Sequence, residues 1–250
     1  MSGHSKWSQI KRQKGVTDTK RGQVFTRLGR EIWVAAKEGG GDVEMNFRLR
    51  LAVQRARDAN MPLDNIERAI KRGTGEGGDG ATVLELTYEG YTPGGAAVLV
   101  QTMTDNKNRT AAEVRRVFSR NGGNLGESGC VGWIFHNKGV ITVAAPSGKA
   151  DDIALAAIDA GAEDVKTDDG VIEVYTPPHS LEQVRGALTS VGASIESSEV
   201  QHVPSNTVPL DPANARLTLH MLEQLEELDD VQKVFTNADF PAEVLAEASG

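Results

Sequence analysis

The sequence has one cysteine and no long apolar run, and both absences restrict the class of protein. Cys130 alone cannot form an internal disulfide or a thiolate metal cluster, which fits a reducing compartment. No apolar run approaches the roughly 18 residues that a membrane span needs. Residues 1–14 are polar and basic, without the hydrophobic segment that a secretion signal requires. We therefore expect a cytoplasmic protein with no membrane partner.

Common signatures of catalysis and of cofactor binding are also missing. The glycine-rich segment 73–80 has no Gly-Lys-Ser/Thr after it and no strand before it, so it is typical of a linker. No Gly-x-Ser-x-Gly marks a nucleophile, although a serine or cysteine paired with a distant histidine stays open. The acidic pairs, Asp229-Asp230 among them, are explained by helix caps and solvated turns. We therefore expect no enzyme, no catalytic residue and no cofactor. We also expect no metal site, because none of the histidines has a second ligand at zinc spacing: His4, His136, His179, His202 and His220.

The net charge of -8 conceals a segregation of the two signs along the chain. Residues 1–75 contain 16 Lys and Arg against 8 Asp and Glu, whereas residues 126–250 contain 6 against 21. Binding of a polyanion depends on the local field, which decays within about 8 Å at physiological salt. The basic first third is therefore able to bind phosphates although the whole chain is acidic.

Helices are predicted throughout the basic third. Apolar residues recur at helical spacing over about 20–37 and over 46–60, and Pro62 opens a shorter helix that Gly73 closes. At 100° per residue, the basic residues of the first helix fall opposite its apolar stripe, so we expect them to point outward. These residues are Lys20, Arg27, Arg30 and Lys37.

Beyond the linker the pattern changes to an α+β arrangement. Strands are predicted at 83–91 and 96–103, then a helix that starts with a capping box of Thr110 and Glu113, then a strand at 132–136. From 139 to 201 the order is βαββαβ, which is the ferredoxin-like motif. The preceding half-domain lacks a helix and a closing strand, which the tail supplies at 214–228 and 231–236. We therefore expect two ferredoxin-like α/β sandwich domains, the second inserted into the first, with boundaries at 1–75, 76–137 plus 204–250, and 138–203.

Several blocks of sequence, in order, resemble one family of proteins. They are GHSKW at 3–7, RG..F at 21–25, N..LR.A at 46–52, NMP..NI.RAI.RG at 60–73, YEGY.P.G at 88–94 and TDN.NRTA..VR..F at 104–118. These blocks resemble the YebC/PmpR family, whose members are described as transcriptional regulators, with mitochondrial relatives that are translational activators. The resemblance implies one helical and two ferredoxin-like domains, a nucleic-acid-binding role, and neither a cofactor nor catalytic residues.

The strongest candidate site is a nucleic-acid interface in the basic third. The segment 2–15 is predicted to be a basic arm in which Trp7 is able to stack on a base, because such an arm has little structural use for an indole. The alternative is a solvated basic surface that pairs with the protein's own acidic half. The residues expected to contact nucleic acid here are Lys6, Trp7, Lys11, Arg12, Lys14, Lys20, Arg21, Arg27 and Arg30.

A second phosphate contact is predicted at 105–110, between a strand end and a helix N-terminus, with Lys107 and Arg109 as the cations. A plain capped turn explains this segment about as well. Tyr88, Trp133 and Phe135 are candidates for a stacking platform, but core packing is the favoured role because the RNA-recognition signature is absent.

The function that we expect is a DNA-binding transcriptional regulator, whose acidic C-terminal domains contact a protein partner or a second copy. An RNA- or ribosome-associated translation factor would use the same basic surface, and the absence of a helix-turn-helix signature weakens base-specific recognition of DNA. A third alternative, a ligand sensor or an enzyme, requires a deep pocket with convergent polar groups. The sequence leaves the target, the direction of regulation and the oligomeric state open.

Overall fold

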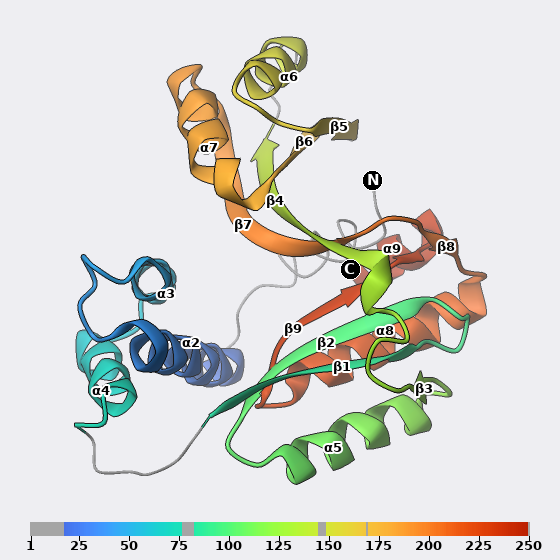
Figure 1. Ribbon diagram of the computed structural model, residues 1–250. Helices are drawn as coiled ribbons and strands as arrows, with labels where there is room; N and C mark the ends of the chain where they lie inside the picture. Colours follow the sequence, from blue (N-terminus) through green and yellow to red (C-terminus); the bar gives the residue numbers. More distant parts are fainter. Residues whose placement is uncertain (1–17, 77–82, 145–148, 169, 250) are drawn as a thin grey trace.

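The computed structural model describes residues 18–76, 83–144, 149–168 and 170–249, and Figure 1 shows their arrangement. The chain has the expected α+β fold, in which helices come first and two α/β sandwiches follow. Residues 1–17, which include the predicted arm, lie outside the described part. None of the described helices combines the length and apolar composition that crossing a lipid bilayer requires.

The helical domain consists of α2 (Asp18–Gly39), α3 (Phe47–Asp58) and α4 (Leu63–Gly73). The predicted apolar stripes meet in one core, in which Ile32, Leu49 and Ile66 are buried. Asn46 orders the connection between α2 and α3: its Oδ1 accepts the N–H of Leu49 at 3.0 Å and its Nδ2 donates to the carbonyl of Ala35 at 2.7 Å. This one side chain caps α3 and ties it to the end of α2.

The middle domain has a four-stranded antiparallel sheet of order β3-β1-β2-β9. Helices α5 and α8 both pack on one face of it, where Val98, Val100, Phe118 and Leu222 form the core. The other face is covered by residues 130–135, which pack on Leu99 and Phe235. The elements are β1 (Leu84–Tyr91), β2 (Ala97–Thr104), α5 (Lys107–Arg120), β3 (Asn124–Leu125), β8 (Val208–Pro209), α8 (Pro212–Glu227), β9 (Val231–Thr236), β10 (Ala238–Asp239) and α9 (Ala242–Ser249).

The inserted domain lies between β3 and β9 in the sequence, which confirms the predicted insertion. Its sheet order β5-β6-β4-β7 is that of the ferredoxin-like βαββαβ motif, with helices α6 and α7 on one face. The long strands β4 and β7 pair from Phe135 to Ala144 and run toward the middle domain (Figure 1). The elements are β4 (Phe135–Ala144), α6 (Ala150–Asp159), β5 (Asp164–Asp168), β6 (Val171–Thr176), α7 (Leu181–Ser190) and β7 (Ser194–Pro204).

Two local predictions are wrong. The strand expected at 132–136 is wrong for its first three residues: Gly132–Ile134 is a 3-10 helix, because the carboxylate of Glu89 accepts the N–H groups of Val131 and Gly132 and folds the segment into a turn, and β4 begins at Phe135. The capping box at Thr110 does not form: Asn106 caps α5 by accepting the N–H of Arg109 at 3.1 Å. Thr110 is instead a buried residue inside the helix.

Candidate nucleic-acid interface

The predicted interface residues fall into three groups in the structure. Lys6, Trp7, Lys11, Arg12 and Lys14 lie outside the described residues. Lys20 and Arg21 belong to the first turn of α2. The remaining four, Arg27, Arg30, Lys107 and Arg109, lie at or near the contact between α2 and the middle domain.

Arg27 and Arg30 reach the C-terminal end of α8. The last carbonyls of a helix have no partner within it and carry a partial negative charge. Arg27 donates to the carbonyl of Glu226, Arg30 to that of Asp229, and Gln23 to that of Glu227 at 3.3 Å. The last turn of α8 has no basic residue of its own, so α2 supplies these donors from another domain.

The outward-facing prediction is therefore wrong at this part of α2. Burial lowers the pKa of Arg27, although the acidic groups of Glu226 and Asp229 act in the opposite direction. The middle domain covers the face that helical periodicity places opposite the apolar stripe. Arg27 and Arg30 act first as contacts between domains.

Asp230 is the centre of this contact. Its side chain is buried in the corner between α8 and β9, and it accepts from Thr110 Oγ1 at 2.7 Å and from Thr104 Oγ1 at 3.0 Å. Two arginines from different domains also reach it: Arg109 at 2.8 Å and Arg30 at 3.0 Å. The expectation that the pair Asp229-Asp230 is solvated is wrong for Asp230.

The electrostatics of Asp230 follow from these donors. Burial alone would raise the pKa of this carboxyl, but the bonds from Arg109 and Thr110 and the charge of Arg30 outweigh burial and hold the pKa below its ordinary value. Asp230 is therefore ionised at neutral pH and neutralises two cations that the sequence assigned to phosphate. Arg109 also pairs with Asp105 at 3.0 Å.

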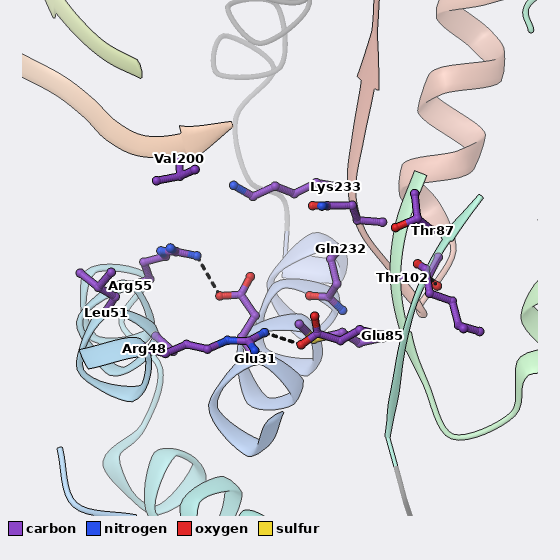
Figure 2. A pocket seen from close by; sticks show the side chains of 14 residues that line it. Glu31, Arg48, Leu51, Arg55, Glu85, Thr87, Thr102, Val200, Gln232 and Lys233 are labelled. Carbon is purple, nitrogen blue, oxygen red and sulfur yellow. Dashed lines mark hydrogen bonds and ion pairs between the residues drawn. The ribbon is translucent and has the colours of Figure 1, made fainter. Parts of the chain in front are cut away.

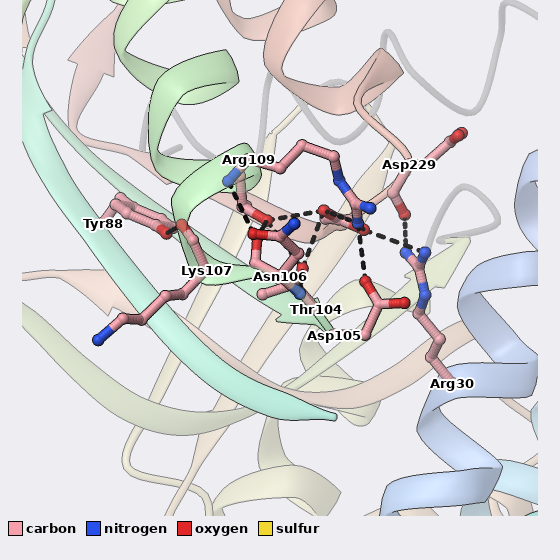
Figure 3. A network of polar contacts seen from close by, with 10 residues as sticks. Arg30, Tyr88, Thr104, Asp105, Asn106, Lys107, Arg109 and Asp229 are labelled. Atoms are coloured by element: carbon pink, nitrogen blue, oxygen red, sulfur yellow. Dashed lines mark hydrogen bonds and ion pairs between the residues drawn. The ribbon is translucent and has the colours of Figure 1, made fainter. Parts of the chain in front are cut away.

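Lys107 differs from Arg109. Its side chain is exposed, and no ion pair of Lys107 is seen among the described residues. Its backbone carbonyl accepts the hydroxyl of Tyr88 at 3.4 Å, which places the two residues side by side (Figure 3). Of the predicted cations at 105–110, Lys107 is the one whose charge the described residues leave unmatched.

The aromatic stacking platform does not form. Trp133 lies in the 3-10 turn and is 70% exposed, whereas Phe135 is buried in the core below the sheet, so the two do not share a strand face. Core packing, the favoured alternative, is correct for Phe135 and wrong for Trp133. The reason is the turn that Glu89 imposes on this segment.

Basic residues on α4, which the sequence reasoning did not select, form an exposed cationic face. Arg68, Lys71 and Arg72 are spaced i, i+3 and i+4 and all three are exposed. The guanidinium of Arg72 lies over the ring of Trp33, 4.8 Å from its centroid. The signal in the sequence was the spacing of these cations near the end of the last helix of the basic third.

A polar pocket of about 320 Å³ lies where the three domains meet (Figure 2). Its charged groups are matched: Arg55 pairs with Glu31 at 3.0 Å, and Arg48 pairs with Glu85. Neither polar atom of the Gln232 side chain has a hydrogen-bond partner among the described residues. The pocket contains convergent polar groups, as the sensor alternative requires, but its cations are held by the protein's own carboxylates.

Cys130 is not poised as a nucleophile. Burial raises the pKa of its thiol, and the nearby carboxylates of Glu89 and Glu127 raise it further, so the thiol stays protonated at neutral pH. The described residues contain no cluster of three metal-ligating side chains. The described geometry thus offers arginine and lysine side chains for anion binding and no activated nucleophile at the lone cysteine.

These observations define the class: a three-domain α+β protein in which a basic helical domain is held against an acidic body. A family model described as the TACO1/YebC protein N-terminal domain matches residues 5–76, and a second, described as the TACO1/YebC second and third domain, matches residues 83–238. The chain belongs to the TACO1/YebC family.

Relatives match over almost the whole chain. A probable transcriptional regulatory protein of Dehalococcoides mccartyi is 56% identical over 98% of this chain and 97% of its own length. One of the same description from Dictyoglomus turgidum is 52% identical over the full length of both. The crystal structure of a conserved hypothetical protein from Aquifex aeolicus is 47% identical, with a TM-score of 0.81 over 91% of this chain and 94% of that one.

Proposed function

We propose that this protein is a nucleic-acid-binding regulator that acts in the cytoplasm, as a DNA-binding transcriptional regulator without covalent chemistry of its own. The observation that carries the proposal is the exposed cationic face of α4, which lies in the part of the chain where Lys and Arg outnumber Asp and Glu by 16 to 8. The relatives described as probable transcriptional regulatory proteins support a regulatory role.

The proposed interface divides the basic residues by task. Phosphate contacts are assigned to the arm, to the start of α2, to α4 and to Lys107. Arg27, Arg30 and Arg109 orient the helical domain, because their guanidinium groups already bind acceptors of the middle domain. The phosphate-binding set is Lys6, Lys11, Arg12, Lys14, Lys20, Arg21, Arg68, Lys71 and Lys107, with Trp7 as a stacking residue.

A second candidate function is RNA or ribosome binding in translational control. It is favoured by the contact of Arg72 with Trp33, because RNA is recognised largely through unpaired bases that stack on aromatic rings and arginine planes. The acidic middle and inserted domains are then available to a protein partner or to a second copy.

Fluorescence anisotropy tests the proposal, with labelled duplex DNA and with structured RNA as separate probes. With about six to ten phosphate contacts, raising salt from about 50 to 200 mM weakens binding by roughly 10³ to 10⁵. Deletion of residues 1–15 should reduce both the affinity and the salt slope. Affinity that is unchanged by the deletion contradicts the role of the arm, and failure of the full chain to bind either probe overturns the proposed function.

Crosslinking in cells, followed by sequencing of the bound DNA and RNA, separates the two candidates. Enrichment of promoter DNA supports the transcriptional role. Enrichment of ribosomal or messenger RNA without DNA supports the translational role and overturns the first candidate.

A further inference from the structure

A groove of about 630 Å³ is lined by residues of α2 and α4, two helices that pack side by side in the helical domain. Phe25, Trp33, Met61 and Ala69 contribute apolar surface to it, and Val83 closes it toward the middle domain. At Gly29 the helix carries no side chain, and a Cβ built there would approach only Met61, at 3.7 Å. A flat apolar ligand therefore has both surface to contact and room to enter.

The described lining of the groove is rich in arginine. Among the described residues, Arg30, Arg68 and Arg72 line it together with the carboxylate of Asp105; Arg30 is held by Asp230, and Asp105 pairs with Arg109. Arg68 donates to the carbonyl of Asp64 at 3.2 Å and to the amide oxygen of Asn65, and both of these acceptors are neutral. An anionic group that enters the groove therefore meets the guanidinium of Arg68, which no carboxylate among the described residues neutralises.

The position of Arg72 gives the groove a stacking surface. Trp33 is 8% exposed, so its ring is fixed in the domain contact with Val83 and Met103. The cation–π contact at 4.8 Å holds the guanidinium over this fixed ring, while the Arg72 residue itself is exposed. The contact with Trp33 fixes the orientation of the guanidinium plane, and bases stack well on arginine planes.

We propose that this groove is a subsite for one unpaired nucleotide of a nucleic acid, whose base stacks on Arg72 and whose phosphate is held by Arg68. The inference rests on the proposed function and adds a preference for unpaired strands. Bases inside a duplex are covered by their neighbours, so a paired nucleotide cannot enter without being extruded. Apolar contact, a stacking plane and an unneutralised arginine together match a nucleotide better than a free inorganic anion, which needs no apolar surface.

Arg72→Lys is the decisive variant, because it keeps the positive charge and removes the planar group. We expect the affinity for a labelled single-stranded RNA dodecamer to fall about tenfold, as loss of one stacked base predicts. Affinity for a fully paired duplex of the same length and the salt slope should stay unchanged. Equal loss on both probes, or no loss on the single strand, overturns the subsite.

Filling the groove provides an independent test. Gly29→Phe places a ring inside the groove and should weaken binding of the single strand, whereas Gly29→Ala adds one ordinary contact to Met61 and should not. Thermal unfolding checks that each variant is folded. If Gly29→Phe fails to fold, Arg72→Lys still decides the question.

Trp33 gives a readout of the subsite itself. In a chain carrying Trp7→Phe and Trp133→Phe, Trp33 is the remaining tryptophan, and its fluorescence should change on addition of the single strand but not of the duplex. If this variant binds single strands with normal affinity and the fluorescence of Trp33 stays unchanged, the subsite is overturned and the proposed function is kept. If the native chain, with all three tryptophans, binds neither probe, both the subsite and the proposed function are overturned.

Discussion

Arg30 Nη2 lies 3.0 Å from Oδ1 of Asp230, and this contact joins the helical domain to the middle domain. The same carboxylate binds Arg109, Thr104 and Thr110 of the middle domain. Because a buried carboxylate is stable only when its lone pairs are satisfied, Asp230 depends on both domains at once. The position of the basic helical domain is thus determined by an acidic residue of the body.

Replacement of Asp230 should destabilise the protein strongly. In Asp230→Ala the guanidinium groups of Arg30 and Arg109 lose their shared partner, and breaking a buried charge pair costs about 3 kcal/mol or more. Urea denaturation measures the loss. Asp229→Ala is the matched control, because Arg30 binds the backbone carbonyl of Asp229, so its stability should change by less than about 0.5 kcal/mol. Equal effects of the two substitutions would contradict the role of Asp230.

Acid should release the same contact. The pKa of Asp230 is lower in the folded protein than in the unfolded chain, so the unfolded chain binds the proton more readily. The stabilisation is fully present above the ordinary aspartate pKa of about 3.9 and is lost as pH falls through the depressed folded value. The difference in unfolding free energy between the native protein and Asp230→Asn should therefore be constant from pH 7 to about pH 5 and shrink below about pH 4. A difference that grows on acidification contradicts this assignment.

Glu89 should control the reactivity of Cys130. Its carboxylate accepts the N–H groups of Gly129 and Val131 at 2.8 Å and of Gly132 at 2.6 Å, which fixes the turn around the thiol. Burial would raise the pKa of Glu89, but these three donors hold it below its ordinary value. Glu89→Gln removes a charge that raises the pKa of the Cys130 thiol and loosens the turn, so alkylation by iodoacetamide at pH 8 should be faster.

The control for Cys130 is Glu127→Gln. Glu127 also lies near the thiol, but its hydrogen bond with Cys130 runs from the backbone N–H of Cys130 to the backbone carbonyl of Glu127, which the substitution leaves in place. Its effect on the alkylation rate should be smaller than that of Glu89→Gln. The reverse order would show that Glu89 does not organise the turn.

Lys71 should contribute to nucleic-acid affinity as a point charge. Lys71→Gln removes one phosphate contact, so it should weaken binding uniformly across sequences and reduce the slope of log K against log salt by about 1. Lys149→Gln removes an exposed lysine from the acidic inserted domain and is expected to leave the slope unchanged. Anisotropy titrations at several salt concentrations measure both slopes. Identical slopes for the two variants would exclude Lys71 from the interface.

Local patterns predicted much of the fold. The apolar spacing located α2, α3 and α4 to within a few residues, because burying one stripe of a helix is a local requirement on the sequence. The insertion was predictable from the order of elements, since the half-built sheet before it needed a closing strand. The capping box at Thr110 failed because Asn106, four residues earlier, takes the capping role and the hydroxyl of Thr110 binds Asp230.

The interface was less predictable than the fold. Periodicity placed Arg27 and Arg30 opposite the apolar stripe, but it does not say whether water or another domain lies there. The spacing of the cations on α4 does not distinguish a binding face from a solvated one, and the contact of Arg72 with Trp33 depends on how two helices pack. Asp230 looked like half of a solvated pair until its position beside two arginines was known.

By itself, the sequence determined the segregation of charge, the positions of the helices and the order of the strands, because these depend on composition and on residues within one or two turns of one another. The tertiary structure decided which cations face solvent. Arg27 and Glu226 are 199 positions apart, and no periodicity brings them together. Their contact arises from the docking of α2 against the end of α8, where unpaired carbonyls and a buried carboxylate attract cations that would otherwise be available to phosphate.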